Sequence, residues 1–313
     1  MIKQLRLQGL RADLGAARTM LAGAEKAGDP VGMLQFQKKI DALEQELAEL
    51  AGATDKLAKV AVFFGGRPVI GSRGVDAEFA SKAMDSFQKL VSRQFARMEA
   101  GDLGSRGPVP VQGEARLMIT DVARGSVGFV LEEAPEQSQM VETELAVAIE
   151  QISDAISRLG GDGDEWADTI EQFDDRVVAC LKEFFSVLDE GGATFRIVEG
   201  SRDREVSHAE ISRARSRADL TRIAQEQTGW IEGQIVGFTS KSFEFAPVAG
   251  EKLTGRMDPG PARLLEKAGM QHELDKLLFT PTRAKFQVRT VANGSLIRRY
   301  HTLIAIDDRS GSD

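Results

Sequence analysis

The sequence predicts an α+β protein in three parts: an N-terminal antiparallel helical hairpin of the coiled-coil type, a mixed α/β middle domain and a small five-stranded β-barrel at the C-terminus. Three observations predict this fold. Leucines recur near the N-terminus at steps of four and three residues, strands and helices mix without regular βαβ alternation in the middle, and short alternating strands fill the last third. The expected boundaries are residues 1–52, 57–224 and 225–308.

The N-terminal hairpin is predicted from two apolar stripes, over residues 2–27 and 31–51, separated by Gly28-Asp29-Pro30. Proline cannot continue the first helix but suits the start of the second, and so short a turn makes the helices antiparallel neighbours. The stripes form the seam of a coiled coil. We expect the hairpin to bury its remaining apolar surface on a second copy, on the rest of the chain or on another protein. The candidate partner-binding residues of the seam are Leu10, Leu14, Leu21, Phe36, Ile40, Leu43 and Leu47.

The middle domain is predicted from a change of hydrophobic period along the chain. Strands are expected at residues 60–64, 115–121, 127–132, 193–199 and 204–206, and helices at 76–98, 138–159, 165–172, 175–189 and 208–218. A hairpin is predicted between the second and third strands because turn-forming residues 123–126 separate them. Residues 67–71 are expected to pair with the first strand through a turn at Gly65-Gly66.

The C-terminal third predicts a small barrel. Strands are expected at residues 230–238, 241–246, 252–257, 284–291 and 296–306, and a helix follows Asp258-Pro259. Asn293-Gly294 between the last two strands is a strong hairpin signal. The order β-β-β-α-β-β resembles an OB-fold or a related small barrel, and the resemblance covers residues 228–307.

The composition points to a globular protein in the cytoplasm. The chain has 313 residues, 42% of them hydrophobic and 28% charged, and its formal net charge is −8. No apolar run approaches the roughly 18 residues of a membrane-spanning helix, and the first residues lack the apolar core of a secretory signal. The single cysteine, Cys180, lies in an amphipathic stretch and is expected to be buried and inert.

The glycine-rich stretch FFGGRPVIGSRGV resembles a phosphate-binding loop only in part. Gly66 and Gly71 have the spacing of the GxxxxGK[ST] motif, but Ser72 and Arg73 stand where lysine and serine or threonine are needed. Pro68 also removes a backbone N–H that would contact a phosphate. We therefore interpret this stretch as a turn that leads into a helix.

No catalytic or metal-binding set can be identified from the sequence. Asp162, Asp164 and Glu165 begin like a calcium loop, but the ligands required further along are missing. The three histidines have no serine, cysteine or aspartate partner that the sequence alone supports. We expect no cofactor and no metal, and an enzyme with a dispersed site stays as an alternative.

A basic segment is the clearest candidate for binding. Residues 280–306 carry five basic residues and no acidic one, whereas residues 132–190 carry 17 acidic and 3 basic residues. In the predicted fourth strand of the barrel, the basic residues alternate with Ala284, Phe286 and Val288, so one face is buried and the other is positive. The candidate residues for nucleic acid or an acidic partner are Arg283, Lys285, Arg289, Arg298, Arg299 and Tyr300.

Three stretches carry a resemblance to a family of uncharacterised bacterial proteins: GRPVIGSRGVDAEFASKAMDSFQKLVSRQFA, ARLMITDVARGSVGFVLEE and residues 230–245. The resemblance implies no activity and no site residues. The sequence as a whole favours a non-enzymatic interaction or regulatory protein. It would self-associate or bind a protein partner through the hairpin, with the barrel as recognition module and no membrane partner. The main alternative is a nucleic-acid-binding protein that uses the basic face of the barrel.

Overall fold

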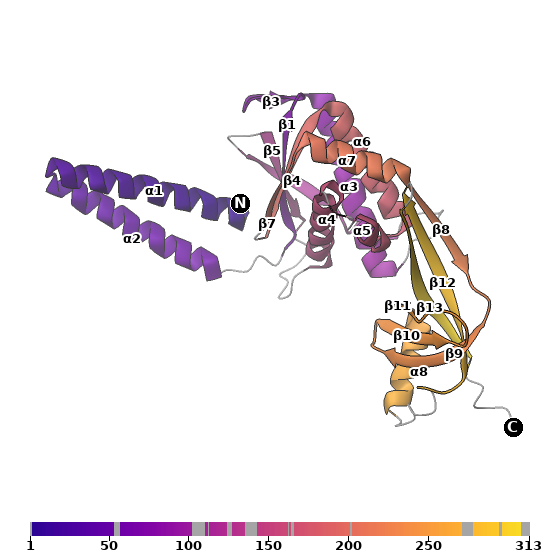
Figure 1. The fold of residues 1–313 in the computed structure, drawn as a ribbon. Coiled ribbons are helices and arrows are strands. Elements are labelled where there is room, and N and C mark those ends of the chain that lie inside the picture. Colours follow the sequence, from indigo (N-terminus) through magenta and orange to yellow (C-terminus); the bar gives the residue numbers. More distant parts are fainter. Residues whose placement is uncertain are drawn as a thin grey trace. The chain divides into compact units, whose positions relative to one another are not determined.

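The computed structural model describes residues 2–52, 57–101, 110–111, 113–123, 127–134, 143–161, 163, 166–200, 202–270, 278–293 and 296–307. The chain divides into two compact units, Met1–Asp219 and Leu220–Asp313. It is a mixed α+β protein, as predicted, and its described residues form eight helices (Figure 1). None of the helices in these residues is long and apolar enough to cross a membrane.

The first unit contains an N-terminal pair of helices and a five-stranded sheet with its own helices. Its helices are α1 (Lys3–Ala27), α2 (Pro30–Gly52), α3 (Ala77–Ala100), α4 (Glu144–Gly160), α5 (Trp166–Glu171), α6 (Asp175–Gly191) and α7 (His208–Leu220), which ends at the junction with the second unit. Its strands are β1 (Lys59–Gly66), β2 (Val69–Ile70), β3 (Gly74–Val75), β4 (Leu117–Ala123), β5 (Val127–Glu133), β6 (Ala193–Glu199) and β7 (Arg202–Val206).

The predicted N-terminal pair of helices is confirmed. The residues between α1 and α2 explain why the first helix ends and the second begins. Gly28 adopts the left-handed conformation, with φ of 62°, that ends many helices. The carboxylate of Asp29 then accepts hydrogen bonds from the backbone N–H groups of Val31 and Gly32, at 3.1 and 3.0 Å. Pro30 occupies the first position of α2, where its missing N–H costs nothing. The two helices run side by side in Figure 1.

The start of α1 is held on the sheet. Ile2 is fully buried in a cluster with residues of β1, β5 and β6, including Phe63. Gln8 donates to Asp203 at 2.7 Å, and Arg196 makes two hydrogen bonds of 2.7 Å to the same carboxylate. The guanidinium of Arg196 also lies 5.0 Å from the centre of the Phe63 ring. The hairpin is therefore fixed to the sheet at its base.

The sheet of the first unit is antiparallel, in the order β4-β5-β1-β6-β7. Phenylalanines join one of its faces to α3 and α6. Phe64 of β1 packs edge-on against Phe79 of α3 at 5.3 Å, and Phe195 of β6 packs against Phe184 of α6 at 5.2 Å. Phe87 of α3 contacts both Phe184 and Phe195. This aromatic cluster forms the centre of the core.

The prediction that residues 67–71 pair with the first strand is wrong. Strand β1 continues through Gly65 and Gly66, which pair with Thr194 and Ala193 of β6, and the short β2 pairs with β3 instead. Gly66 has a φ of 79°, and a Cβ atom there would lie 2.5 Å from the carbonyl oxygen of Gly192. Gly66 therefore permits close contact with the neighbouring strand rather than a hairpin turn.

The second unit contains the predicted closed barrel of five strands. Its elements are β8 (Thr221–Gln227), β9 (Ile231–Phe238), β10 (Ser242–Pro247), β11 (Leu253–Met257), α8 (Pro259–Met270), β12 (Thr282–Asn293) and β13 (Leu296–Asp307). The ring runs β9-β10-β11-β13-β12 and returns to β9. Only the pairing of β11 with β13 is parallel. Strand β8, which the sequence analysis did not predict, pairs with β12 outside the ring.

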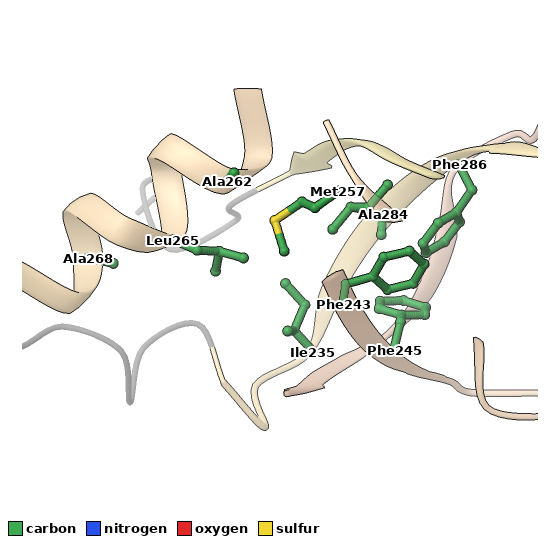
Figure 2. Close-up of a cluster of buried hydrophobic side chains, with 10 residues drawn as sticks. Ile235, Phe243, Phe245, Met257, Ala262, Leu265, Ala268, Ala284 and Phe286 are labelled. Carbon is green, nitrogen blue, oxygen red and sulfur yellow. The ribbon is translucent and has the colours of Figure 1, made fainter. Parts of the chain in front are cut away.

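The barrel is filled by aromatic side chains from its strands. Phe286 packs against both Phe243 and Phe245, with ring centres 5.2 Å apart in both pairs (Figure 2). Leu265 of α8 reaches the same cluster (Figure 2). A Cβ atom on Gly255 would lie 1.9 Å from the carbonyl oxygen of His301, so only glycine allows β11 to approach β13 this closely.

The two units divide after Asp219, whereas the sequence predicted a boundary between residues 224 and 225. The break expected between residues 224 and 225 falls inside β8, whose residues 221–227 pair with β12 of the second unit. Leu220 begins that unit. The division of the first unit into separate hairpin and middle domains stays a prediction.

Candidate binding face of the barrel

The outer side of β12 carries the basic residues that the sequence analysis selected on this strand. Ala284, Phe286 and Val288 are buried, and side chains alternate along a strand. Arg283, Lys285, Gln287 and Arg289 therefore point to the opposite, outer side, where they are partly exposed. The predicted alternation of buried and charged residues is thus present in the barrel.

Strand β13 places Tyr300 next to the basic residues of β12, but its own Arg298 and Arg299 lie on opposite sides of the sheet. Arg289 pairs with Tyr300, and directly paired residues of antiparallel strands project to the same side. Arg298 lies on this side too, next to Val291, which is fully buried. Arg299 pairs with Thr290 on the other side of the sheet. Five of the six predicted residues therefore share the outer side, and Arg299 does not.

Arg283 is surrounded by acidic residues. It forms an ion pair with Asp307 of β13, its pairing partner there, and it pairs with Glu232 on β9. Its guanidinium also lies 5.8 Å from the centre of the Trp230 ring. Because the carboxylate of Asp307 is paired with this guanidinium, Arg283 adds no net positive charge to the outer side.

Two residues that the sequence analysis did not select extend the outer side. Arg256 of β11 is exposed and is the register partner of Thr302, which in turn pairs with Gln287. Trp230 precedes β9 and is 47% exposed, so a large part of its ring is open to solvent. The alternation of Thr254 and Arg256 with buried Met257 was the signal that could have identified Arg256.

We call the resulting surface the binding face; it consists of Trp230, Arg256, Lys285, Arg289 and Tyr300. The residues that the register places between its charged members are polar and uncharged. Gln287 pairs with Gln227 and Thr302, and Arg289 pairs with Gln225, whose amide oxygen accepts a hydrogen bond from Gln287 at 3.2 Å. Arg289 and Tyr300 thus lie beside the amide side chains of Gln225 and Gln287.

The opposite side of β13 has a different character. His301 lies on this side, opposite Val288, and is half-buried. Burial lowers the pKa of His301, and the neighbouring charge of Arg299 lowers it further. Both effects favour the neutral imidazole, so this side does not gain positive charge from the histidine at neutral pH.

The seam residues of the hairpin lie between α1 and α2. Leu10 and Ile40 are buried, and the other five predicted seam residues, Leu14, Leu21, Phe36, Leu43 and Leu47, are half-buried. Ion pairs of Arg6 with Glu46 and of Arg18 with Glu44 flank the seam. Since the helices of one chain cover the seam between them, a partner would meet the outward residues of the hairpin. That these seven residues bind a partner stays a prediction.

A polar cluster around Asp189 in the first unit holds helices together. Asp189 of α6 accepts hydrogen bonds from the Ser212 hydroxyl and from Arg215 (2.9 Å), and His208 lies 3.9 Å away. Burial tends to raise the pKa of Asp189, but these hydrogen bonds outweigh it and the pKa is lowered. Because Ser212 donates to the carboxylate and not to the histidine, the cluster lacks the order of a nucleophile relay.

The described residues contain no group of three or more histidine, cysteine or acidic side chains placed to hold a metal ion. Asp162, Asp164 and Glu165, which begin like a calcium loop, lie outside the described residues, as do His272 and Gly294. Cys180 is buried, as expected, and burial raises the pKa of its thiol.

The glycine-rich segment is arranged unlike a phosphate-binding loop. Asp76 caps the N-terminus of α3 and accepts a hydrogen bond from the backbone N–H of Phe79 at 2.8 Å. A carboxylate therefore already occupies the positive end of the helix, where a phosphate would bind. The side chain of Arg67 is engaged by the backbone carbonyl groups of Glu190 and Gly191.

Comparison of the chain with family models, with curated proteins and with solved structures gives no match. No residue role is therefore transferred from a relative. The binding face is defined by the strand register and side-chain exposure of this chain alone.

Proposed function

We propose that this protein is a binding protein whose C-terminal barrel is OB-like and binds single-stranded nucleic acid on the binding face. The strand order supports an OB-like barrel. A helix lies between the third and fourth strands of the ring, β11 and β12, and the third and fifth strands pair in parallel. Small barrels of this kind bind oligonucleotides in other proteins.

The observation that carries the proposal is the pairing of Arg289 with Tyr300 beside Lys285 and Arg256. Single-stranded nucleic acid needs cations for its phosphates and aromatic rings for its bases, and these side chains supply both. Trp230 adds a second ring, whose centre lies 5.8 Å from the guanidinium of Arg283. Lys285 and Arg289 lie four residues apart, or about 13 Å along the strand, so these two cations can contact separate phosphates of one extended strand.

The shape of the binding face favours a single strand over a duplex. Readers of duplex DNA usually insert a helix or a two-stranded ribbon into the major groove. The binding face is instead one side of a sheet of several strands, and its aromatic residues suit unpaired bases that can stack on them. A strand lying along β12 can use both its phosphates and its bases.

The test is the affinity of the full chain for a fluorescent oligothymidine, measured by anisotropy at low salt. Lys285→Ala and Arg289→Ala are expected to weaken binding several-fold each, because each removes one phosphate contact. Arg299→Ala is the matched control, since it removes an exposed arginine from the other side of the same sheet. Equal losses in all three variants would mean that only net charge matters and would refute a specific face.

A second candidate function is self-association through the hairpin as a coiled coil. It is favoured by exposed apolar residues near the turn: Val31 is 65% exposed, Leu34 is 59% exposed and Met20 is 53% exposed. Ile2 packs on the sheet, so deleting residues 1–52 would also uncover Phe63. The cleaner test is Val31→Glu combined with Leu34→Glu in the full chain. Light scattering should show a lower mass than for the unchanged protein, and an unchanged mass would reject this candidate.

A further inference from the structure

A groove opens in the second unit close to the binding face, and the phosphate contacts described above do not use it. It has a volume of about 410 Å³ and lies where β9, the end of β10 and the start of β12 meet. Its lining includes Glu232, Gln234, Pro247, Val248, Pro281 and Arg283. Pockets that hold small molecules span about 300–1,000 Å³, so the groove is large enough for a nucleobase with its sugar.

The side chains of the groove suit a flat heterocycle. Pro247 and Pro281 are rigid and apolar, and Val248 is 81% exposed beside them. Gln234 offers a hydrogen-bond donor and an acceptor on one planar group, which is what the edge of a base requires. Apolar walls with a few polar groups are typical of ligand sites.

Arg283 connects the groove to the binding face. Its Nη2 atom is engaged by Asp307, whereas its Nε atom is buried and finds no hydrogen-bond acceptor among the described residues. The same guanidinium lies 5.8 Å from the centre of the Trp230 ring. The groove and Trp230 therefore adjoin one side chain, and a strand that stacks on Trp230 can place its next base in the groove.

We propose that this groove binds one unstacked base of a single-stranded nucleic acid whose phosphates lie on the binding face. The inference rests on the proposed function and adds a site for the base. Gln234 contacts the polar edge of the base, the prolines and Val248 contact its faces, and Trp230 stacks on the neighbouring base. Phosphate contacts alone do not distinguish bases, so recognition of the base falls to the groove.

Trp230 offers a direct readout of occupancy. The chain has two tryptophans, and Trp166 is buried at 4% exposure. A Trp166→Phe background leaves Trp230 as the single reporter, and circular dichroism checks that this background is folded. Should Trp166→Phe not fold, the unchanged protein serves, because buried Trp166 then contributes a constant signal.

The experiment uses two probes on the full chain: adenosine 5′-monophosphate, followed by Trp230 fluorescence, and an oligothymidine against a strand of equal length without bases. We expect saturable quenching by the nucleotide, and at least about tenfold tighter binding of the strand with bases. Val248→Asp and Gln234→Leu should weaken both effects about tenfold. Lys267→Ala, on the exposed side of α8, is the control and should change neither.

The outcomes separate the inference from the proposed function. If the strands bind through Lys285 and Arg289 but neither bases nor Val248→Asp alter the affinity, the groove inference is overturned and the function stands. If the nucleotide binds in a Val248-dependent manner but no strand binds, the proposed function is overturned while base binding by the groove is supported. If neither probe binds, both are overturned.

Discussion

The hairpin and the barrel begin from the same kind of sequence pattern but present different surfaces. Each alternates apolar and polar positions, with the period of a helix in one and of a strand in the other. In the hairpin the apolar stripes of α1 and α2 cover each other, and ion pairs such as Arg18 with Glu44 neutralise the flanks. In the barrel the apolar side chains close a core, and the register places Lys285, Arg289 and Arg256 near the uncharged Gln287 and Thr302.

The difference shows where a partner can gain binding energy. The flanks of the hairpin carry charges of both signs side by side, so their fields largely cancel at a distance. A surface of like charge attracts a polyanion over distances of about a Debye length, or roughly 10 Å at 0.1 M salt. Under the proposed function, a polyanion therefore binds the barrel and not the hairpin.

The largest effect is expected from the barrel core. Phe286→Ala removes a fully buried ring that contacts Phe243 and Phe245, and it should lower the free energy of unfolding by about 3–5 kcal/mol. Leu14→Ala in the half-buried hairpin seam should cost only about 1–2 kcal/mol. Urea unfolding of both variants tests the contrast. Similar losses would mean that the seam is as tightly packed as the barrel.

A smaller effect is expected at the base of the hairpin. The hydrogen bonds from Arg196 lower the pKa of Asp203, so this carboxyl stays ionised in the fold at pH values where it is protonated in the unfolded chain. Its stabilisation is present above the ordinary pKa of about 4 and is lost as the pH falls through the lowered value. Asp203→Asn should cost about 1.5–3 kcal/mol at pH 7.

The pH dependence of Asp203→Asn sharpens this prediction. Unfolding of the unchanged protein and of the variant is measured by urea between pH 2 and 5, spanning the ordinary pKa of about 4. The difference between them should shrink as the pH falls. A constant difference would show that the cost comes from packing and not from the ion pair with Arg196.

The smallest effect is expected on the side of the sheet opposite the binding face. Since burial lowers the pKa of His301, the unfolded chain binds a proton more readily than the folded one just below the ordinary pKa of 6.5. The contribution of His301 to the free energy of unfolding is therefore complete above pH 6.5 and decreases as the pH falls below that value. His301→Gln should reduce the fall of Tm between pH 7.5 and 5.5. An unchanged pH profile would assign the loss to other groups.

Much of the fold could be predicted from the sequence because its signals are local. The steps of four and three residues in α1 and α2 identify the helical pair, and the alternation around Phe243 and Phe286 identifies barrel strands. What was missed depends on pairing between distant residues. Strand β8 forms only because β12 pairs with it, and Gly65-Gly66 looked like a turn because its partner β6 lies more than a hundred residues away.

Only part of the candidate site could be predicted, because only part of it depends on residues close together in the sequence. Alternation within β12 is local, so the shared outer side of Lys285 and Arg289 could be read from the sequence. The position of Arg299 and the acidic neighbours of Arg283 depend on the register of β13 and β9, which alternation within one strand does not determine. Arg256 joins the face through a parallel pairing that no short-range signal indicates.

The most direct test of the central claim is the salt dependence of oligothymidine binding. Neutralising about three phosphates by Arg256, Lys285 and Arg289 predicts that log affinity falls against log salt with a slope of about −2, and Arg289→Ala should reduce the slope by about 0.7. Arg299→Ala should leave it unchanged. A slope near zero, or an equal change in both variants, would contradict binding of nucleic acid on this face.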